Sequence, residues 1–208
     1  MEARSRGAAP ETAAPPGSAP ARRRADAERN IEAILEAALV CFGRGPSASM
    51  TEIARTAGVG RVTLYGHFPS REALLDAVVE RSLASANAAL DDLDVDSGPP
   101  DEALRRLIAS SWRIVDRHRS LLAAALEHLG SDRVREQHAS VMSRVERLIA
   151  RGQAAGVFAT DVPLDWLVTT FYTLTHAAAQ AADDGRLTPE TAPAVLTQTL
   201  LRALTSRD

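Results

Sequence analysis

The segment from Ser49 to Phe68, SMTEIARTAGVGRVTLYGHF, holds the most closely spaced residues that could do chemistry. Ser49 with Glu52 three residues later is a capping-box pair, which predicts that a short helix begins there. Gly58 adopts a positive φ at little cost, as a tight turn between two crossing helices requires. A second short helix begins at Arg61. Two short helices around a glycine turn, with polar residues early in the second, predict a helix-turn-helix that presents this second helix to DNA.

The second short helix is expected to have one inward and one outward side. Leu64 and Phe68 are four residues apart and should pack inward, which leaves four polar residues facing the nucleic acid: Arg61, Thr63, Tyr65 and His67. Arg61 has the chemistry of a bidentate guanine contact, but a solvated arginine or a phosphate contact fits it as well. Tyr65 also fits a half-buried packing position, and its neighbours favour DNA contact over that alternative.

Histidines in the second half of the chain are the other candidates for chemistry. His118 and His138 fall on apolar faces, and His128 lies beside Glu127. Such histidines are either hydrogen-bonded core residues or ligands of a metal or an anion, but their spacing matches no metal motif. An acid–base enzyme built on His128 and Glu127 is a further alternative, without support from a nucleophile elbow or phosphate loop. Because Cys41 is the only cysteine, a cysteine-based zinc site is excluded. We expect that the protein is not an enzyme and that it binds neither a cofactor nor a metal.

The elements that must position these residues all have helical periodicity, and no alternating strand pattern interrupts it. Gly43, Gly58 and Pro69 punctuate the first half, and Thr188-Pro189 resembles an N-cap followed by proline at the first helical position. The fold is therefore predicted to be all-α, with about nine helices. Their apolar faces span Ile31–Phe42, Ser49–Ala57, Arg61–Phe68, Ser70–Leu90, Leu104–Val115, Leu121–Leu129, Val134–Ile149, 164–182 and Val195–Leu204.

Composition limits the class of protein. No apolar run approaches the roughly 18 residues of a membrane span, and the N-terminus lacks the apolar region of a signal peptide, so we expect a cytoplasmic protein. The net charge is −3, yet residues 1–82 carry 11 Arg against 10 acids and residues 83–208 carry 13 Arg against 17, so the N-terminal part is the more basic. We expect a disordered basic arm (1–24), a helix-turn-helix domain (25–70) and a ligand-binding and dimerisation domain (71–208). Arg22–Arg24 are either a solvated charge run or an arm that contacts DNA.

Residues 29–78 resemble the DNA-binding domain of the tetracycline-repressor (TetR) family, through ILEAALVCFGRGP and EIARTAGVGRVTLYGHFPSREALLDAV. The resemblance implies DNA contacts by Thr63 and Tyr65, and phosphate contacts by His67 and Arg71. Val62 stands where a glycine is common, Gly66 replaces a larger residue and Gly60 replaces the usual serine cap, so base preference should differ from that of relatives. The whole expected DNA-binding set is Ser49, Thr51, Arg61, Val62, Thr63, Tyr65, His67 and Arg71.

The tail GQAAGVFATDVPLDWLVTTFYTLTHAAA resembles the C-terminal domains of actinobacterial members. The resemblance implies a homodimeric, ligand-responsive regulator, most often a repressor, that binds a palindromic double-stranded DNA operator. A mainly apolar small-molecule effector held among the fifth to eighth helices would move the long fourth helix. Expected lining residues are Ile108, Trp112, Val115, Leu126, His138, Val141, Met142, Tyr172 and His176. Expected dimer contacts are Leu164, Leu167, Phe171, Leu196, Leu200 and Leu204. A partner-binding protein without a ligand is the third alternative.

Overall fold

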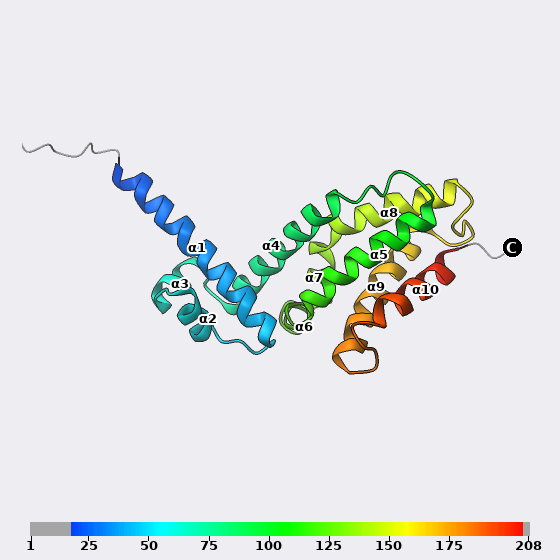
Figure 1. The fold of residues 1–208 in the computed structure, drawn as a ribbon. Helices are drawn as coiled ribbons and strands as arrows, with labels where there is room; N and C mark the ends of the chain where they lie inside the picture. Colours follow the sequence, from blue (N-terminus) through cyan, green and yellow to red (C-terminus); the bar gives the residue numbers. More distant parts are fainter. Residues whose placement is uncertain (1–17, 206–208) are drawn as a thin grey trace, which may run out of the picture.

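The computed structural model describes residues 18–205, and residues 1–17 and 206–208 lie outside the described part (Figure 1). The prediction of an all-helical chain is confirmed over these residues, whose β structure is limited to an isolated bridge between Phe158 and Thr205. They form ten helices: α1 Ser18–Arg44, α2 Met50–Ala57, α3 Arg61–His67, α4 Arg71–Asp91, α5 Pro100–Arg117, α6 Arg119–His128, α7 Ser131–Gln137, α8 Ala139–Ala154, α9 Leu164–Asp183 and α10 Ala192–Leu204.

One core lies where α1, α2, α3 and the first half of α4 converge. Ile34 and Phe42 of α1, Ile53 of α2 and Leu64 of α3 are all fully enclosed there. The core continues along α4 as far as Val79 and takes in residues of α6 and α7: Leu121, Ala124, Ala125 and Val134. The small N-terminal unit therefore rests directly on α6, and it forms one end of an elongated molecule (Figure 1).

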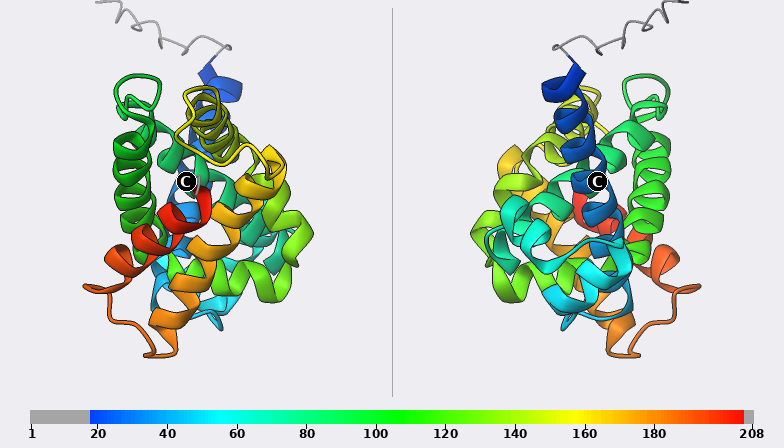
Figure 2. Two further views of the ribbon diagram at one scale, coloured as in Figure 1. Left: turned by 90° about the vertical axis from the view of Figure 1, so that its right-hand side faces the viewer. Right: turned by 90° about the vertical axis from the view of Figure 1, so that its left-hand side faces the viewer.

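A second core lies where α5, α8, α9 and α10 pack together with the end of α4. Its enclosed residues include Leu90, Leu104, Leu148, Phe171 and Leu200. The two views in Figure 2 show these helices gathered around the C-terminal part of the chain. Because Leu75 belongs to the first core and Leu90 to the second, α4 is shared between the two. The expected domain boundary between residues 70 and 71 therefore falls at the start of a helix that both cores use.

Three helix boundaries differ from those expected. The single helix expected over Val134–Ile149 is two helices, α7 and α8, that meet at His138. The last helix begins at Ala192 rather than near Thr188, because Thr188 and Thr191 close a turn through a backbone hydrogen bond of 3.1 Å. Residues Arg22–Arg24, expected in a disordered arm, lie within α1, while residues 1–17 of that arm are outside the described part.

Five of the six expected dimer contacts are enclosed within a single chain. The five enclosed residues are Leu167, Phe171, Leu196, Leu200 and Leu204, each 3% exposed or less, and only Leu164 is partly exposed. The apolar stripes of α9 and α10 pack against each other and against α5 and α8 within one chain. Periodicity identified the buried face of each helix correctly, but it carries no information on whether the same chain or a second copy covers that face.

Candidate nucleic-acid interface and ligand cavity

The turn between α2 and α3 has the local structure that its sequence predicts. The Ser49 hydroxyl accepts a hydrogen bond from the backbone N–H of Glu52 at 3.2 Å, which caps the start of α2. Gly58 ends that helix with φ 69°, where a side chain would be strained. Gly60 begins α3 without a side-chain cap, as expected. These contacts hold α3 across α2 and leave its first turn with free backbone N–H groups.

The outward side of α3 is exposed and polar except for one residue. Leu64 is fully enclosed, so the helix is anchored through this face, while Val62 is 88% exposed and Tyr65 is 42% exposed. The Arg61 guanidinium carbon lies 5.9 Å from the centre of the Tyr65 ring, and both side chains point away from the core. Thr63 and His67 are half-buried at its edges, and Ser49 and Thr51 are exposed at the start of α2. An exposed valine beside arginine and tyrosine suits a surface that meets both thymine methyls and phosphates.

Arg71, the expected phosphate contact at the start of α4, is turned into the protein instead. Its Nη1 donates to the Nε2 atom of His128 at 2.7 Å, and its Nη2 donates to the carbonyl of Pro46. The guanidinium also lies over the Phe42 ring, 5.4 Å from its centre. Since the arginine can only donate, the His128 Nε2 atom must be the acceptor. Arg71 therefore connects the helix-turn-helix unit to the end of α6, rather than facing the surface around α3.

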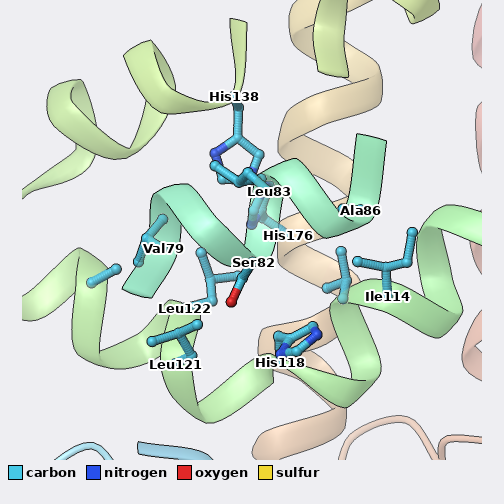
Figure 3. A pocket seen from close by; sticks show the side chains of 12 residues that line it. Val79, Ser82, Leu83, Ala86, Ile114, His118, Leu121, Leu122, His138 and His176 are labelled. Atoms are coloured by element: carbon cyan, nitrogen blue, oxygen red, sulfur yellow. The ribbon is translucent and has the colours of Figure 1, made fainter. Parts of the chain in front are cut away.

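A small cavity of about 60 Å³ lies between α4, α5, α6 and α9 (Figure 3). Its walls are mainly apolar, with Val79, Leu83 and Ala86 from α4. Four polar residues interrupt them: Ser82, His118, His138 and His176. A second cavity of about 50 Å³ shares Leu83, His138 and His176 with the first and extends toward Met142 and Tyr172. No acidic or arginine side chain is among the described residues that line either cavity.

Two of the three cavity histidines lie at breaks between helices, and burial favours the neutral form of all three. His118 separates α5 from α6, and His138 separates α7 from α8. Burial lowers the pKa of both, and burial lowers the pKa of His176 to about 4, with smaller contributions from the charges of His138 and Arg135. The Nδ1 atom of His138 donates to the carbonyl of Val134 at 2.7 Å. A neutral His138 therefore presents an unprotonated Nε2, which is a hydrogen-bond acceptor.

Two buried polar atoms of the cavity walls have no hydrogen-bond partner among the described residues: the Ser82 hydroxyl and the Nδ1 atom of His176. Both residues line the first cavity. The His176 ring packs beside Tyr172, with centres 4.2 Å apart, and beside His138, with centres 5.2 Å apart. Buried polar atoms without partners are uncommon and call for an explanation. A hydroxyl or amide group of a bound molecule is the kind of partner that each of these atoms lacks.

The structure brings six of the nine expected lining residues to the cavities: Val115, His138, Val141, Met142, Tyr172 and His176. The other three expected residues lie outside both cavities. Ile108 and Trp112 are enclosed in the second core, and Leu126 is 40% exposed on the outside of α6. On α6, Leu121, Leu122 and Ala125 face the cavity, and Leu126 is one step, about 100°, further around the helix. The α4 residues of the wall were missed because the ligand was expected among the fifth to eighth helices.

The described residues contain no group of three or more His, Cys, Asp and Glu side chains that could hold a metal. His128 is engaged with Arg71 and lies 3.9 Å from the exposed carboxylate of Glu127. That pair faces neither cavity. Among the described helices, none is both long and apolar enough to cross a membrane.

Family profiles match both parts of the chain. The profile described as bacterial regulatory proteins, tetR family, matches residues 34–78, and the tetracyclin repressor-like C-terminal domain profile matches residues 100–183. The HTH-type transcriptional repressor LfrR of Mycolicibacterium smegmatis is 32% identical over 180 residues, 82% of this chain and 88% of that protein. The HTH-type transcriptional repressor NicS of Pseudomonas putida is 30% identical over 150 residues, 67% of this chain and 71% of that one.

Solved structures agree with this similarity. The crystal structure of LfrR from Mycobacterium smegmatis in complex with proflavine has a TM-score of 0.64 at 27% identity, covering 86% of this chain and 98% of that one. A TetR-family transcriptional regulator from Rhodococcus has the same fold, with a TM-score of 0.71 at 22% identity, covering 86% of this chain and all of that one.

Proposed function

This chain belongs to the TetR family of bacterial regulatory proteins, and we propose that two copies of it repress transcription by binding a palindromic operator, which a neutral, mainly apolar ligand releases. It is a transcriptional regulator with a helix-turn-helix domain and a C-terminal ligand-binding domain, and not an enzyme. The observation that carries the DNA proposal is the outward side of α3, where Arg61, Val62 and Tyr65 are exposed beside Thr63.

The operator is tested by selecting bound duplexes from a random oligonucleotide pool. A two-fold dimer should return an inverted repeat, with half-site centres about one helical turn (~34 Å) or a multiple apart. Thr63→Ala or Arg61→Ala should change the bases that are selected, because base contacts carry the specificity. A pool that returns no enriched palindrome would count against the proposal.

The chemistry of the cavity supports an uncharged ligand. Among the described residues, no carboxylate lines it to neutralise a cation. The histidines are neutral, and Arg135 lies 5.0 Å from the centre of the Tyr172 ring. An apolar body of one or two rings suits the walls. A hydroxyl group suits the two unpartnered atoms of Ser82 and His176 and the acceptor nitrogen of His138. LfrR binds proflavine, a cation, so we expect the ligand of this chain to differ in charge.

A probe series with one aromatic body separates these features. We expect 2-naphthol to raise the melting temperature more than naphthalene, 2-naphthoate or proflavine, because only the first is neutral and offers a hydroxyl group. His176→Phe keeps a ring of similar size, and it removes an Nδ1 atom that has no hydrogen-bond partner among the described residues. It should remove the preference of 2-naphthol over naphthalene. Equal shifts by both compounds in the unmodified protein, or a larger shift by proflavine, would contradict the proposed ligand class.

The dimer surface that we propose is the outward face of α9 and α10. Trp166 of α9 is 63% exposed and Val195 of α10 is 43% exposed, and water contact is costly for such large apolar groups. After Trp166, the next exposed residues along α9 are uncharged: Thr173, Ala177 and Gln180. A second copy of the same face would bury this surface around a two-fold axis, as homodimers do.

Replacing Trp166 by glutamate tests this surface. The variant should be a folded monomer at low micromolar concentration, since Trp166 contributes little to the core of its own chain. Leu126→Glu is the matched control, because Leu126 is 40% exposed on α6, outside the proposed face, and this variant should stay dimeric. Light scattering that finds a monomeric unmodified protein, or a dimeric Trp166→Glu variant, would refute the assignment.

Coupling between ligand and operator is proposed to run through α4 and α6. On one side, Arg81 of α4 pairs with Glu32 of α1. On the other, Asp76 of α4 accepts two hydrogen bonds from Arg133 of α7, at 2.8 and 2.9 Å. The same helix lines the cavity with Ser82 and Leu83. A ligand that binds one placement of α4 more tightly would shift the equilibrium toward that placement, to the extent of its differential affinity for the two states. The spacing of the two α3 helices would change with it.

A further inference from the structure

The first helix extends well beyond the domain that it helps to build. At a rise of 1.5 Å per residue, the 27 residues of α1 are about 40 Å long. Ile34 is the first residue of this helix that is fully enclosed, and Glu32 is bound to Arg81 of α4. Before these anchors, roughly 20 Å of helix projects away from the rest of the molecule (Figure 1). A helix without packing partners along two or more turns is not explained by the fold alone.

This projecting part of α1 carries a run of three exposed arginines, Arg22, Arg23 and Arg24. None of the three forms an ion pair within the described residues, whereas Arg29, further along the helix, pairs with Asp26. Successive helical residues are about 100° apart, so the three guanidinium groups spread over about 200° of the helix surface. The three arginines therefore cover a little more than half of the circumference of the helix.

The projecting end of α1 and the outward side of α3 lie on the same side of the molecule. Both are at the left of Figure 1, and both come forward when that side is turned toward the viewer in the right panel of Figure 2. The C-terminal helices α9 and α10 lie at the opposite end (Figure 1). A DNA duplex that meets α3 therefore has the arginine-bearing end of α1 beside it.

We propose that Arg22, Arg23 and Arg24 bind the sugar–phosphate backbone next to the half-site that α3 contacts, and so lengthen the DNA footprint of each protomer. The inference rests on the proposed function, because it requires DNA at α3. Arginine matches phosphate geometry with paired N–H donors. These contacts are to phosphates and not to base edges of the minor groove. A helix about 10 Å wide does not fit into a groove about 6 Å wide.

Backbone contacts of this kind have a measurable salt signature. Each phosphate neutralised on duplex DNA adds about 0.9 to the slope of log K against log salt concentration. Three arginines in each of two protomers therefore contribute up to ~5 to this slope. Raising the salt concentration from about 50 to about 200 mM should weaken DNA binding by the unmodified protein up to ~10³-fold more than DNA binding by a variant without these arginines.

The experiment compares the full chain with Arg22→Gln/Arg23→Gln/Arg24→Gln, since glutamine preserves helix propensity. The control is Arg105→Gln/Arg113→Gln/Arg117→Gln, which removes the same charge from exposed positions of α5. Binding is measured on the selected palindrome in two duplexes, one that ends at the palindrome and one with about ten extra base pairs on each side. We expect the unmodified protein and the control to prefer the longer duplex. The α1 variant should lose that preference and most of the additional salt slope, and it should select the same palindrome.

Two results would overturn the inference: an α1 variant with an unchanged salt slope and flank preference, or one that selects a different base sequence. The second result would place the arginines on base edges. Equal melting temperatures of the variant and the unmodified protein establish that the helix-turn-helix is intact. If the unmodified protein itself selects no palindrome, the proposed function fails. If it selects one and the α1 variant behaves identically, only this inference fails.

Discussion

Replacing His128 by alanine should weaken the response of the operator complex to ligand without weakening ligand binding. His128 lies at the end of α6, and earlier residues of that helix, Leu121, Leu122 and Ala125, line the cavity. Its Nε2 atom accepts the 2.7 Å hydrogen bond from Arg71, which also holds the Pro46 carbonyl in the loop before α2. These hydrogen bonds therefore connect α6, which lines the cavity, with the helix-turn-helix unit.

The expected magnitude follows from the contacts that are lost. A hydrogen bond with a charged donor contributes about 1.5–3 kcal/mol, and partial exposure of both residues favours the lower half of this range or slightly less. His128→Ala should then cost about 1–2 kcal/mol of the free energy of unfolding. Arg71→Ala also loses the Pro46 contact and the stacking on Phe42, and it should cost about 2–4 kcal/mol.

If α6 carries the signal, a coupling loss of about 1–2 kcal/mol reduces the effect of ligand on operator affinity by about 5- to 30-fold. The assay titrates 2-naphthol into a complex of the protein with the selected palindrome and measures release by fluorescence anisotropy. Glu127→Ala is the control, because Glu127 is the exposed neighbour of His128 on the same helix. We expect the control to behave like the unmodified protein. Unchanged release by the His128→Ala variant, or a loss of 2-naphthol binding by that variant, would refute this path.

Three further predictions test the fold, the cavity and the DNA contact. Gly152→Ala should cost about 2–3 kcal/mol in chemical denaturation, because its methyl group would overlap the enclosed ring of Phe158, whereas Gly43→Ala meets open space and should not destabilise. The pKa of His176 is lowered from 6.5 to about 4. Between these two pH values the unfolded chain therefore binds a proton at His176 that the folded chain does not bind. The free energy of unfolding should therefore fall by up to ~3 kcal/mol as the pH drops from about 6.5 to about 4, and His176→Phe should flatten this slope. Tyr65→Phe should weaken binding to the palindrome and to a scrambled duplex by the same factor, since a phosphate contact carries no base information.

Local sequence signals were sufficient to predict the helix-turn-helix. Capping by Ser49, the positive φ of Gly58 and the inward Leu64 are properties of a few consecutive residues, and each is present in the structure. The all-helical fold follows from periodicity for the same reason. The break at His138 was missed because α7 and α8 have apolar faces in nearly continuous register across it.

Assignments that depend on a neighbouring element could not be made from the sequence. Leu200 was expected at a dimer surface, but α5, α8 and α9 already enclose it within one chain, and the exposed Trp166 marks the outer face instead. Arg71 was expected on DNA, and only the position of His128, 57 residues later, explains why it turns inward. Sequence patterns predict which face of a helix is buried, whereas the identity of the covering element depends on the tertiary structure.

The most direct test of ligand-controlled repression measures one complex, that of the protein with its operator duplex. Native mass spectrometry gives its stoichiometry, and fluorescence anisotropy gives its dependence on ligand. A labelled duplex that carries the selected palindrome should bind two protomers. It should then be released by the most stabilising member of the naphthalene series. The His128→Ala variant should stay bound to the duplex up to higher concentrations of the same compound. A complex with one protomer, or a duplex that remains bound by the unmodified protein when its cavity is saturated, would contradict the account.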